Sequence, residues 1–289
     1  MKPSPFDYHA PRSLGEALDV LAEAGEHGKV LAGGQSLIPM LNMRLAAPAH
    51  LVDINRLTEL ATLDVEPGGV RVGALARHAQ VERSGRVATV QPLLRQALRL
   101  VAHPVIRNRG TVVGSLVHAD PAAELPAVLV LLGGSVRLAR CGALRDVPAA
   151  GFLTGPLESA VEPGELAVSA FFPLLAPRSG TAFREVARRH GDYALAGIAA
   201  LVELDDDLRI TAARVTCVSV GPVPVLVDVT EACGHRPPAS ADWVSAARAV
   251  QDRIEPEADI HASGDYRRHL AGVLAQQALR DAARAALDA

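Results

Sequence analysis

Apolar residues near the start of the chain recur at spacings that alternate between those of helices and strands. The capping box Ser13-Leu14-Gly15-Glu16 precedes apolar residues three to four positions apart, and Gly25 follows them, so we expect a helix over residues 14–24. The apolar run 29–32 ends in Gly33-Gly34, which is typical of a buried strand that enters a tight turn. The pattern also predicts a helix over 36–45 and a strand over 50–54. This alternation indicates an α/β start.

The middle of the chain continues the mixed pattern. Two short apolar stretches flank Pro67-Gly68-Gly69, which predicts a hairpin over residues 62–74. Residues 109–118 form an apolar segment that is interrupted by glycines. The spacing of apolar residues further predicts helices over 77–83, 91–102 and 122–132, and a strand over 166–172.

Turn-forming residues predict a domain boundary near residue 175. Pro173, Pro177, Ser179 and Gly180 cluster there. Beyond this point the pattern predicts strands over 182–187, 208–220 and 223–229, and helices over 194–204, 239–254 and 266–287. We therefore expect two α+β domains, over about 1–175 and 178–289.

Composition narrows the possible functions. The 289 residues contain 29 Lys and Arg against 32 Asp and Glu, a formal charge of −3, so the chain has no basic excess to neutralise a nucleic acid backbone. The three cysteines, Cys141, Cys217 and Cys233, are too few for an iron–sulfur cluster that is held by four thiolates, and they form no disulfide pattern. We expect no nucleic acid partner and no cluster on this chain.

Several common sites and signals are missing from the sequence. It contains no P-loop, no G-x-G-x-x-G, no H-E-x-x-H and no G-x-S-x-G motif, and the ten histidines show no metal-binding spacing. We therefore expect no catalytic acid, base or nucleophile and no metal site. Residues 1–10 lack the apolar region of a signal peptide, and no apolar stretch is long enough to span a membrane, which predicts a cytoplasmic protein.

Two glycine-rich loops are the candidates for ligand binding. Residues 31–37 read Leu-Ala-Gly-Gly-Gln-Ser-Leu, and residues 107–115 read Arg-Asn-Arg-Gly-Thr-Val-Val-Gly-Ser. Glycines let a backbone approach a ligand closely, so either loop could hold a phosphate through its amide groups. Each loop could also be a purely structural turn. Two such loops without a P-loop lysine favour a pyrophosphate that is held mainly by backbone amides.

A third candidate lies just past the predicted boundary. Tyr193 follows Arg188-Arg189-His190-Gly191-Asp192 in a polar turn, and aromatic residues make up only 3% of the chain. This side chain could stack on a planar ring, or it could be an ordinary, partly buried tyrosine.

Four segments together carry a resemblance to a known family. They are Ala-Gly-Gly-Gln-Ser-Leu at 32–37, Ile-Arg-Asn-Arg-Gly-Thr at 106–111, His-Ala-Asp-Pro-Ala-Ala-Glu-Leu-Pro at 118–126 and Gly-Asp-Tyr-Ala at 191–194. In this order, they resemble the FAD-binding medium subunit of the molybdenum hydroxylases, such as aerobic carbon monoxide dehydrogenase, nicotine-type dehydrogenases and bacterial xanthine dehydrogenase. The similarity extends over essentially the whole chain.

The resemblance implies a more detailed fold than the apolar pattern does. Residues 1–175 would form a FAD-binding domain of the PCMH, or vanillyl-alcohol-oxidase, type, with subdomains over about 1–57 and 58–175. Residues 178–289 would form the C-terminal domain of the CO dehydrogenase flavoprotein type, a three-stranded antiparallel sheet with helices that closes over the flavin.

The resemblance also implies which residues bind FAD. The first loop would wrap the pyrophosphate, the second would contribute further phosphate contacts, and later residues would lie near the rest of the cofactor. The implied set is Val30, Leu31, Ala32, Gly33, Gly34, Gln35, Ser36, Leu37, Thr111, Gly114, Ser115, His118, Asp120, Glu124, Ala167, Arg184 and Tyr193. Among these, Ala167, Arg184 and Tyr193 would lie near the flavin ring, and Arg184 or Arg189 would stabilise its reduced anion.

Two positions depart from the family pattern. Val113 stands where relatives often have glycine, and a β-branched residue resists positive φ. Either the backbone at Val113 is ordinary, or the loop is shifted and its contact with FAD weakened. Ser115 stands where many relatives have Asn, which shortens the side chain but keeps its hydrogen-bonding capacity.

The implied activity is electron transfer within a complex. The flavin would take electrons from [2Fe–2S] clusters on a small partner subunit and pass them to a quinone, NAD⁺, O₂ or another acceptor, while a large subunit with a molybdenum cofactor oxidises the substrate. The complex would be a heterotrimer or a dimer of heterotrimers. One alternative is a stand-alone FAD-dependent oxidoreductase with its own small-molecule substrate. Another, motivated by Val113, is a structural subunit without flavin.

Overall fold

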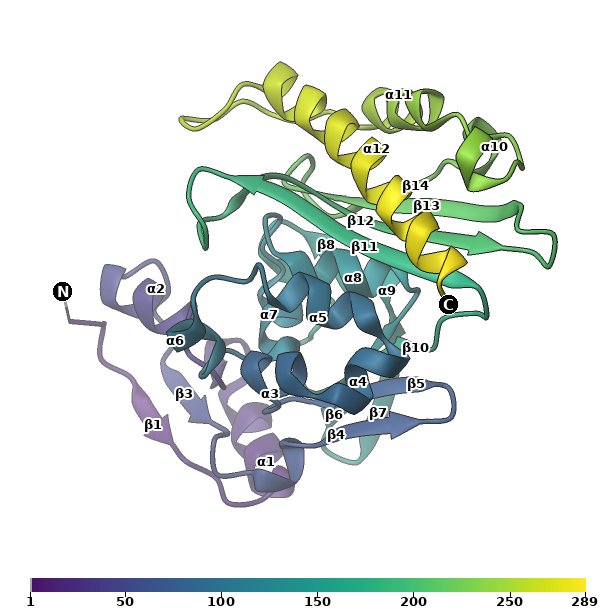
Figure 1. Cartoon of the computed structure of the whole chain (residues 1–289). Helices are drawn as coiled ribbons and strands as arrows, with labels where there is room; N and C mark the ends of the chain where they lie inside the picture. The colour runs from purple at the N-terminus through teal and green to yellow at the C-terminus, as the bar shows by residue number, and fades with distance from the viewer. Residues whose placement is uncertain (1) are drawn as a thin grey trace.

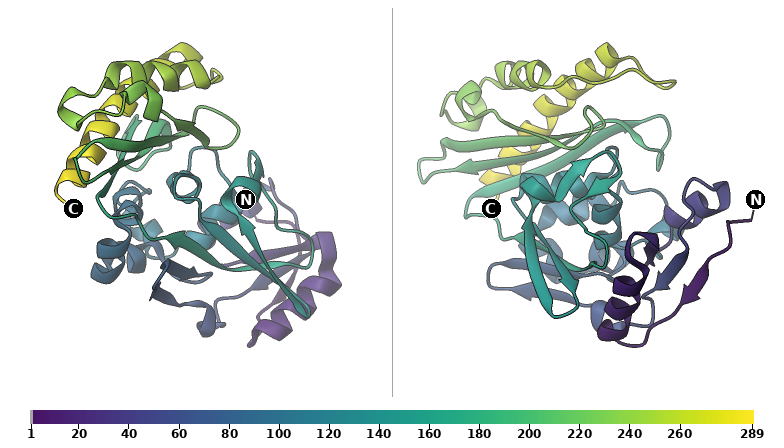
Figure 2. Two further views of the ribbon diagram at one scale, coloured as in Figure 1. Left: turned by 90° about the vertical axis from the view of Figure 1, so that its right-hand side faces the viewer. Right: turned by 180° about the vertical axis from the view of Figure 1, so that it is seen from behind.

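The computed structural model describes residues 2–289 and consists of two bodies that pack against each other (Figure 1). The first contains a small sheet and a larger sheet with most of the short helices. The second contains one sheet with a long C-terminal helix across its outer face (Figures 1 and 2). In the part of the chain described, no helix combines the length and apolar character needed to span a bilayer.

The small sheet is parallel and lies at the N-terminus. Its strands are β1 (Asp7–His9), β3 (His50–Asp53) and β2 (Gly28–Leu31), in that order across the sheet. Helix α1 (Leu14–Ala24) packs beside it and begins as predicted, since the Ser13 side chain accepts a hydrogen bond from the Glu16 amide at 3.2 Å. Helix α2 (Leu37–Met43) follows the first glycine loop.

The larger sheet is antiparallel and supplies most of the first body's core. Its order is β4 (Leu63–Glu66), β5 (Gly69–Gly73), β10 (Leu166–Pro173), β6 (Ser135–Arg140) and β7 (Ala143–Pro148), so the predicted hairpin at 62–74 is confirmed. The β6–β7 hairpin was not predicted. The helices of this body are α3 (His78–Arg83), α4 (Gly85–Val90), α5 (Pro92–Leu98), α6 (Pro104–Arg107), α7 (Val112–His118), α8 (Glu124–Leu131) and α9 (Ala149–Phe152). A two-stranded ribbon of β8 (Leu153–Gly155) and β9 (Glu158–Ser159) completes it.

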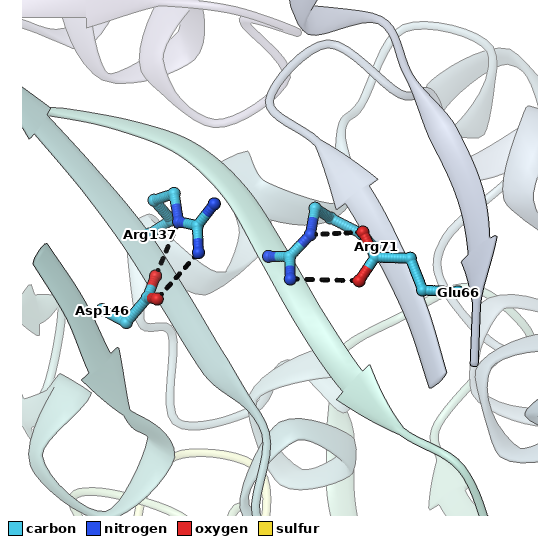
Figure 3. Close-up of polar contacts among 4 residues, drawn as sticks. All are labelled: Glu66, Arg71, Arg137 and Asp146. Atoms are coloured by element: carbon cyan, nitrogen blue, oxygen red, sulfur yellow. Dashed lines mark hydrogen bonds and ion pairs between the residues drawn. The ribbon is translucent and has the colours of Figure 1, made fainter. Parts of the chain in front are cut away.

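Two cross-strand ion pairs lie on the partly exposed side of this larger sheet (Figure 3). Arg137 on β6 makes two 2.8 Å contacts with Asp146, its direct partner on β7. Arg71 on β5 bonds Glu66 and places its guanidinium 5.0 Å from the ring centre of Phe171 on β10. The neighbouring positions point to the core, where Phe172 is fully buried.

The second body is built on a four-stranded antiparallel sheet. Its strands run in chain order: β11 (Ser179–Ala187), β12 (Ala194–Leu204), β13 (Ile210–Val218) and β14 (Val225–Asp228). The expected sheet had three strands, and the observed one adds a short edge strand. The helices are α10 (Thr230–Cys233), α11 (Trp243–Arg253) and α12 (Gly264–Leu287), and α12 lies across β11 and β12. Three 3₁₀ segments, Gly25–His27, Thr58–Leu60 and Pro238–Ser240, complete the chain.

The helix predicted over 194–204 is wrong, because this segment is the central strand β12. Both faces of the strand are buried. Ala199 and Leu201 join the core of the first body, whereas Ile198 and Val202 pack under α12. A strand that is buried on both faces has no apolar–polar alternation, so its sequence does not distinguish it from a buried helix.

Two substitutions in the larger sheet should differ in their effect on the free energy of unfolding. Phe172→Ala leaves a cavity in the fully buried core, so we expect it to lower the free energy of unfolding by about 3–5 kcal/mol. Arg137→Ala breaks a half-exposed ion pair and should cost less than about 1 kcal/mol. Urea unfolding followed by circular dichroism measures both values. Equal losses for the two variants would contradict this assignment of the core.

Candidate functional site

A cavity of about 1180 Å³ lies between the two bodies. It exceeds the range of roughly 300–1,000 Å³ that is usual for small-molecule sites. The first body contributes both glycine-rich loops, and the second contributes three loop segments at its near edge. The cavity therefore has the size and position for an extended ligand that touches both bodies.

The two glycine-rich loops touch each other at one wall of this cavity. A Cβ on Gly33 would lie 2.5 Å from the Arg109 carbonyl oxygen and 2.8 Å from the Gly110 Cα, so only glycine allows the approach. Gly34 has a φ of +72°. Within residues 2–289, the amides of Gly34, Gln35 and Ser36 donate no hydrogen bond. Three unpaired amides in a glycine cradle provide donors for an anionic group.

The second loop leads directly into α7. The Thr111 side chain caps this helix by accepting a hydrogen bond from the Gly114 amide at 3.1 Å. A Cβ on Gly114 would lie 2.6 Å from the same Thr111 oxygen. Val113 lies within α7 and is buried, so its backbone is ordinary and the loop keeps its helical course. Val113 therefore gives no structural ground for a weakened site.

A polar network that the sequence analysis missed holds the two loops together. Arg77 donates to the Arg109 carbonyl at 2.7 Å and to the Asn55 side chain at 2.6 Å. Asn55 in turn donates to the Ala32 carbonyl at 2.8 Å. Arg77 and Asn55 belong to no recognisable sequence motif, and only the fold brings them together between the loops.

Buried His78 lies directly behind this contact. Its amide donates to the Gly110 carbonyl at 2.9 Å, and its ring lies against Gly110. Burial lowers the pKa of His78 to about 4, so the imidazole is neutral at physiological pH. The sequence contained no signal for this role, because His78 belongs to no motif.

Two carboxyl groups approach each other where the bodies meet. Glu124 begins α8 and lines the cavity. Glu185 on β11 lies near the Glu124 side chain. Burial, together with the charge of Glu185, raises the pKa of Glu124 to about 8. Burial raises the pKa of Glu185 to about 7. Nearby Asp120 accepts a hydrogen bond from the Ala122 amide at 2.8 Å. Glu124 is therefore mostly protonated at neutral pH, whereas Glu185 is protonated about half of the time.

The second body forms the remaining wall. The turn between β11 and β12 carries Tyr193, which is 70% exposed and lies at the cavity edge. Gly191 in this turn, with a φ of +86°, sits against the ring of His103 from the first body. The turn after β13 and the loop between α11 and α12 also line the cavity. The sequence analysis did not predict that either of these last two segments belongs to the site.

Fifteen of the seventeen residues implied by the resemblance line this one cavity, and two do not. Those that do are Val30, Ala32, Gly33, Gly34, Gln35, Ser36, Leu37, Thr111, Gly114, Ser115, His118, Asp120, Glu124, Ala167 and Tyr193. Leu31 lies in β2 behind the loop and does not line the cavity.

Arg184 does not lie at the cavity, which corrects the expectation that it faces the flavin ring. Side chains on β11 alternate, so Arg184 points to the outer face of the sheet while Glu185 points inward. There, Arg184 pairs with Asp281 of α12 at 2.5 Å. Its guanidinium therefore fastens α12 to the sheet.

The residues present fit an extended dinucleotide such as FAD. The unpaired amides of the first loop suit a pyrophosphate, and the close approach at Gly33 gives that group room beside the second loop. Apolar Ala167 and exposed Tyr193 provide surfaces for a flat ring.

Comparison with known proteins places the chain in a family. Residues 4–175 match the FAD binding domain in molybdopterin dehydrogenase, and residues 181–282 match the CO dehydrogenase flavoprotein C-terminal domain. The chain is 39% identical to the 6-hydroxypseudooxynicotine dehydrogenase complex subunit alpha of Paenarthrobacter nicotinovorans, with 98% of this chain and 96% of the relative covered.

Two solved structures have the same fold. A chain of quinoline 2-oxidoreductase from Pseudomonas putida 86 superposes with a TM-score of 0.93 at 35% identity, covering 99% of this chain and 100% of that one. A chain of carbon monoxide dehydrogenase from Hydrogenophaga pseudoflava superposes with a TM-score of 0.91 at 34% identity, covering 98% of both. The chain therefore belongs to the FAD-binding medium subunits of the molybdenum hydroxylase-type dehydrogenases.

Proposed function

We propose that this chain is the electron-transfer subunit of a molybdenum hydroxylase-type complex. When bound, FAD would supply the redox chemistry, which is electron transfer from iron–sulfur clusters on a small partner subunit to an external acceptor. A large partner subunit with the molybdenum cofactor would oxidise the substrate. This assignment is supported by the relatives, whose names identify them as subunits of dehydrogenase complexes.

The observation that carries the proposal is the contact between the two glycine-rich loops. It leaves three unpaired amides at one cavity wall, where the backbone could bind an anionic group. Arg77 and Asn55 hold this wall in place from behind. The cysteine count agrees with a cluster-bearing partner, because three cysteines cannot supply the four thiolates that such a cluster needs.

The other residues of the cavity hold and shield the bound cofactor. Protonated Glu124 offers a hydrogen-bond donor where an ionised carboxylate would only accept. Tyr193 and the loops of the second body line the opposite side of the cavity and would shield a bound cofactor from part of the solvent. The chain's own contribution to the reaction is thus binding, orientation and electrostatic environment.

Partner subunits are tested by co-expression. We expect the chain to co-purify with the products of neighbouring reading frames, one with eight cluster cysteines and one of molybdopterin type, and the reduced complex to transfer electrons to the flavin. A chain that stays alone in the presence of these partners and oxidises a small molecule by itself would contradict the proposal and favour the stand-alone oxidoreductase.

Gly33→Ala should weaken FAD binding by at least about tenfold, because the added Cβ would force the two loops apart. Fluorescence titration of the apoprotein with FAD measures the dissociation constant, and the visible spectrum reports bound flavin. Gly15→Ala is the matched control, since a Cβ there in α1 meets nothing within 4 Å. Equal FAD affinity of the two variants would show that the first loop is not part of the binding site.

The contribution of Glu124 and Glu185 to the stability of the apoprotein should fall as the pH rises from about 5 to about 8.5. Glu124 and Glu185 have folded-state pKa values above those of the unfolded chain, so the folded state binds extra protons below these values and loses that stabilisation as the carboxyls ionise. The double variant Glu124→Gln, Glu185→Gln should flatten this decline.

Urea unfolding at a series of pH values measures this effect. Glu23→Gln on the exposed side of α1 serves as the control and should keep the pH dependence of the unsubstituted chain. A double variant whose stability declines as steeply as that of the control would show that these carboxyls ionise normally in the folded protein.

A further inference from the structure

Arg267 joins all three segments with which the second body lines the cavity. It lies in the first turn of α12, and only 7% of its surface is exposed. Its guanidinium donates to the Leu195 carbonyl at 2.7 Å, to the Ser219 carbonyl at 3.3 Å and to the Asp259 carboxylate at 2.7 Å. These residues belong to the start of β12, the turn after β13 and the loop between α11 and α12.

The Ser219 turn connects this arginine to the first body. Ser219 has a φ of +61°, a conformation that is unfavourable for a residue other than glycine, so its neighbours must hold it in place. Its carbonyl accepts from Arg267, and its amide donates to the Pro121 carbonyl at 3.0 Å. Pro121 follows Asp120 in the segment between α7 and α8. A chain of hydrogen bonds therefore runs from α12 to the segment that follows the second glycine-rich loop and its helix.

Asp259 gives the loop between α11 and α12 a fixed shape. One carboxylate oxygen accepts from the amides of His261 and Ala262 at 2.8 and 2.9 Å, and the other receives Arg267. The carboxylate thus orders its own loop and attaches that loop to α12. The charge pair also neutralises Arg267, which would otherwise be a buried, unpaired cation.

We infer that Arg267 is a positioning residue for FAD. It holds the wall formed by the second body against the segment that follows the second glycine-rich loop, and thereby determines how tightly the cavity encloses its ligand. The inference rests on the proposed FAD-binding function. No contact between Arg267 and the cofactor is needed, because the arginine acts through Ser219, Leu195 and Asp259.

The test compares Arg267→Gln with two controls on the same helix. Arg280→Gln removes an exposed arginine, and Leu279→Ala destabilises the core of the second body away from the cavity. Hydrogen exchange of the apoprotein, FAD affinity and melting temperature are measured for each variant. We expect Arg267→Gln to raise the FAD dissociation constant at least about tenfold and to speed amide exchange in residues 219–221 and 255–262. Both controls should keep the exchange of these segments and the FAD affinity.

The results separate a positioning role from general destabilisation. Leu279→Ala should lower the melting temperature without loosening the cavity wall, whereas Arg267→Gln should do both. If Arg267→Gln loosens the two segments no more than Leu279→Ala does, the inference is overturned. Hydrogen exchange needs no ligand, so an unsubstituted chain that fails to bind FAD would contradict the proposed function and leave the exchange comparison valid.

Asp259→Asn provides a second variant in case the first does not fold. It keeps an oxygen for the amides of His261 and Ala262 but removes the charge that pairs with Arg267. We expect faster exchange in residues 255–262 and a smaller rise in the FAD dissociation constant than for Arg267→Gln. Unchanged exchange and affinity in this variant would show that the pair does not hold the wall.

Discussion

The site depends on the contact of backbone with backbone at Gly33, where two loops more than seventy residues apart in sequence meet without an intervening side chain. Any Cβ there would collide with Arg109, so the two loops can form this cavity wall only because residue 33 is glycine. The surrounding polar residues follow from this contact. Arg77 and Asn55 bond backbone carbonyl groups of the two loops, and the neutral His78 ring packs against Gly110.

The second body completes the site by a different physical means. Its sheet is buried on both faces: Phe183 and Leu201 pack on the first body, while Ala182 and Val202 pack under α12. The loops at the end of this sheet are polar, and hydrogen bonds of Arg267 and Asp259 hold them in place. An apolar platform thus carries loops of fixed shape to the edge of the cavity, an arrangement that suits the enclosure of a large cofactor.

The parts of the site that could be predicted from the sequence are those with local signals. Gly33-Gly34 and the segment around Thr111 are recognisable as glycine-rich turns, and the family resemblance assigned Glu124 and Tyr193. The residues that the sequence analysis misplaced or missed depend on the alternation of side chains along a strand or on tertiary contacts. Arg184 and Glu185 are adjacent in sequence, yet they face opposite sides of β11, so the sequence alone does not show which of them points toward the cavity. Ser219 and Arg267 acquire their roles only through contacts across tens of residues.

The position of Arg267 also has a consequence for the order in which the protein matures. Synthesis proceeds from the N-terminus, and at roughly 5–20 residues per second the first body leaves the ribosome well before the last helix. Both glycine-rich loops can therefore meet while α12 is still being made. The wall that Arg267 fastens forms only after α12 has been made, so the cavity stays open on one side until then. A cofactor could therefore reach both glycine-rich loops before the second body encloses it.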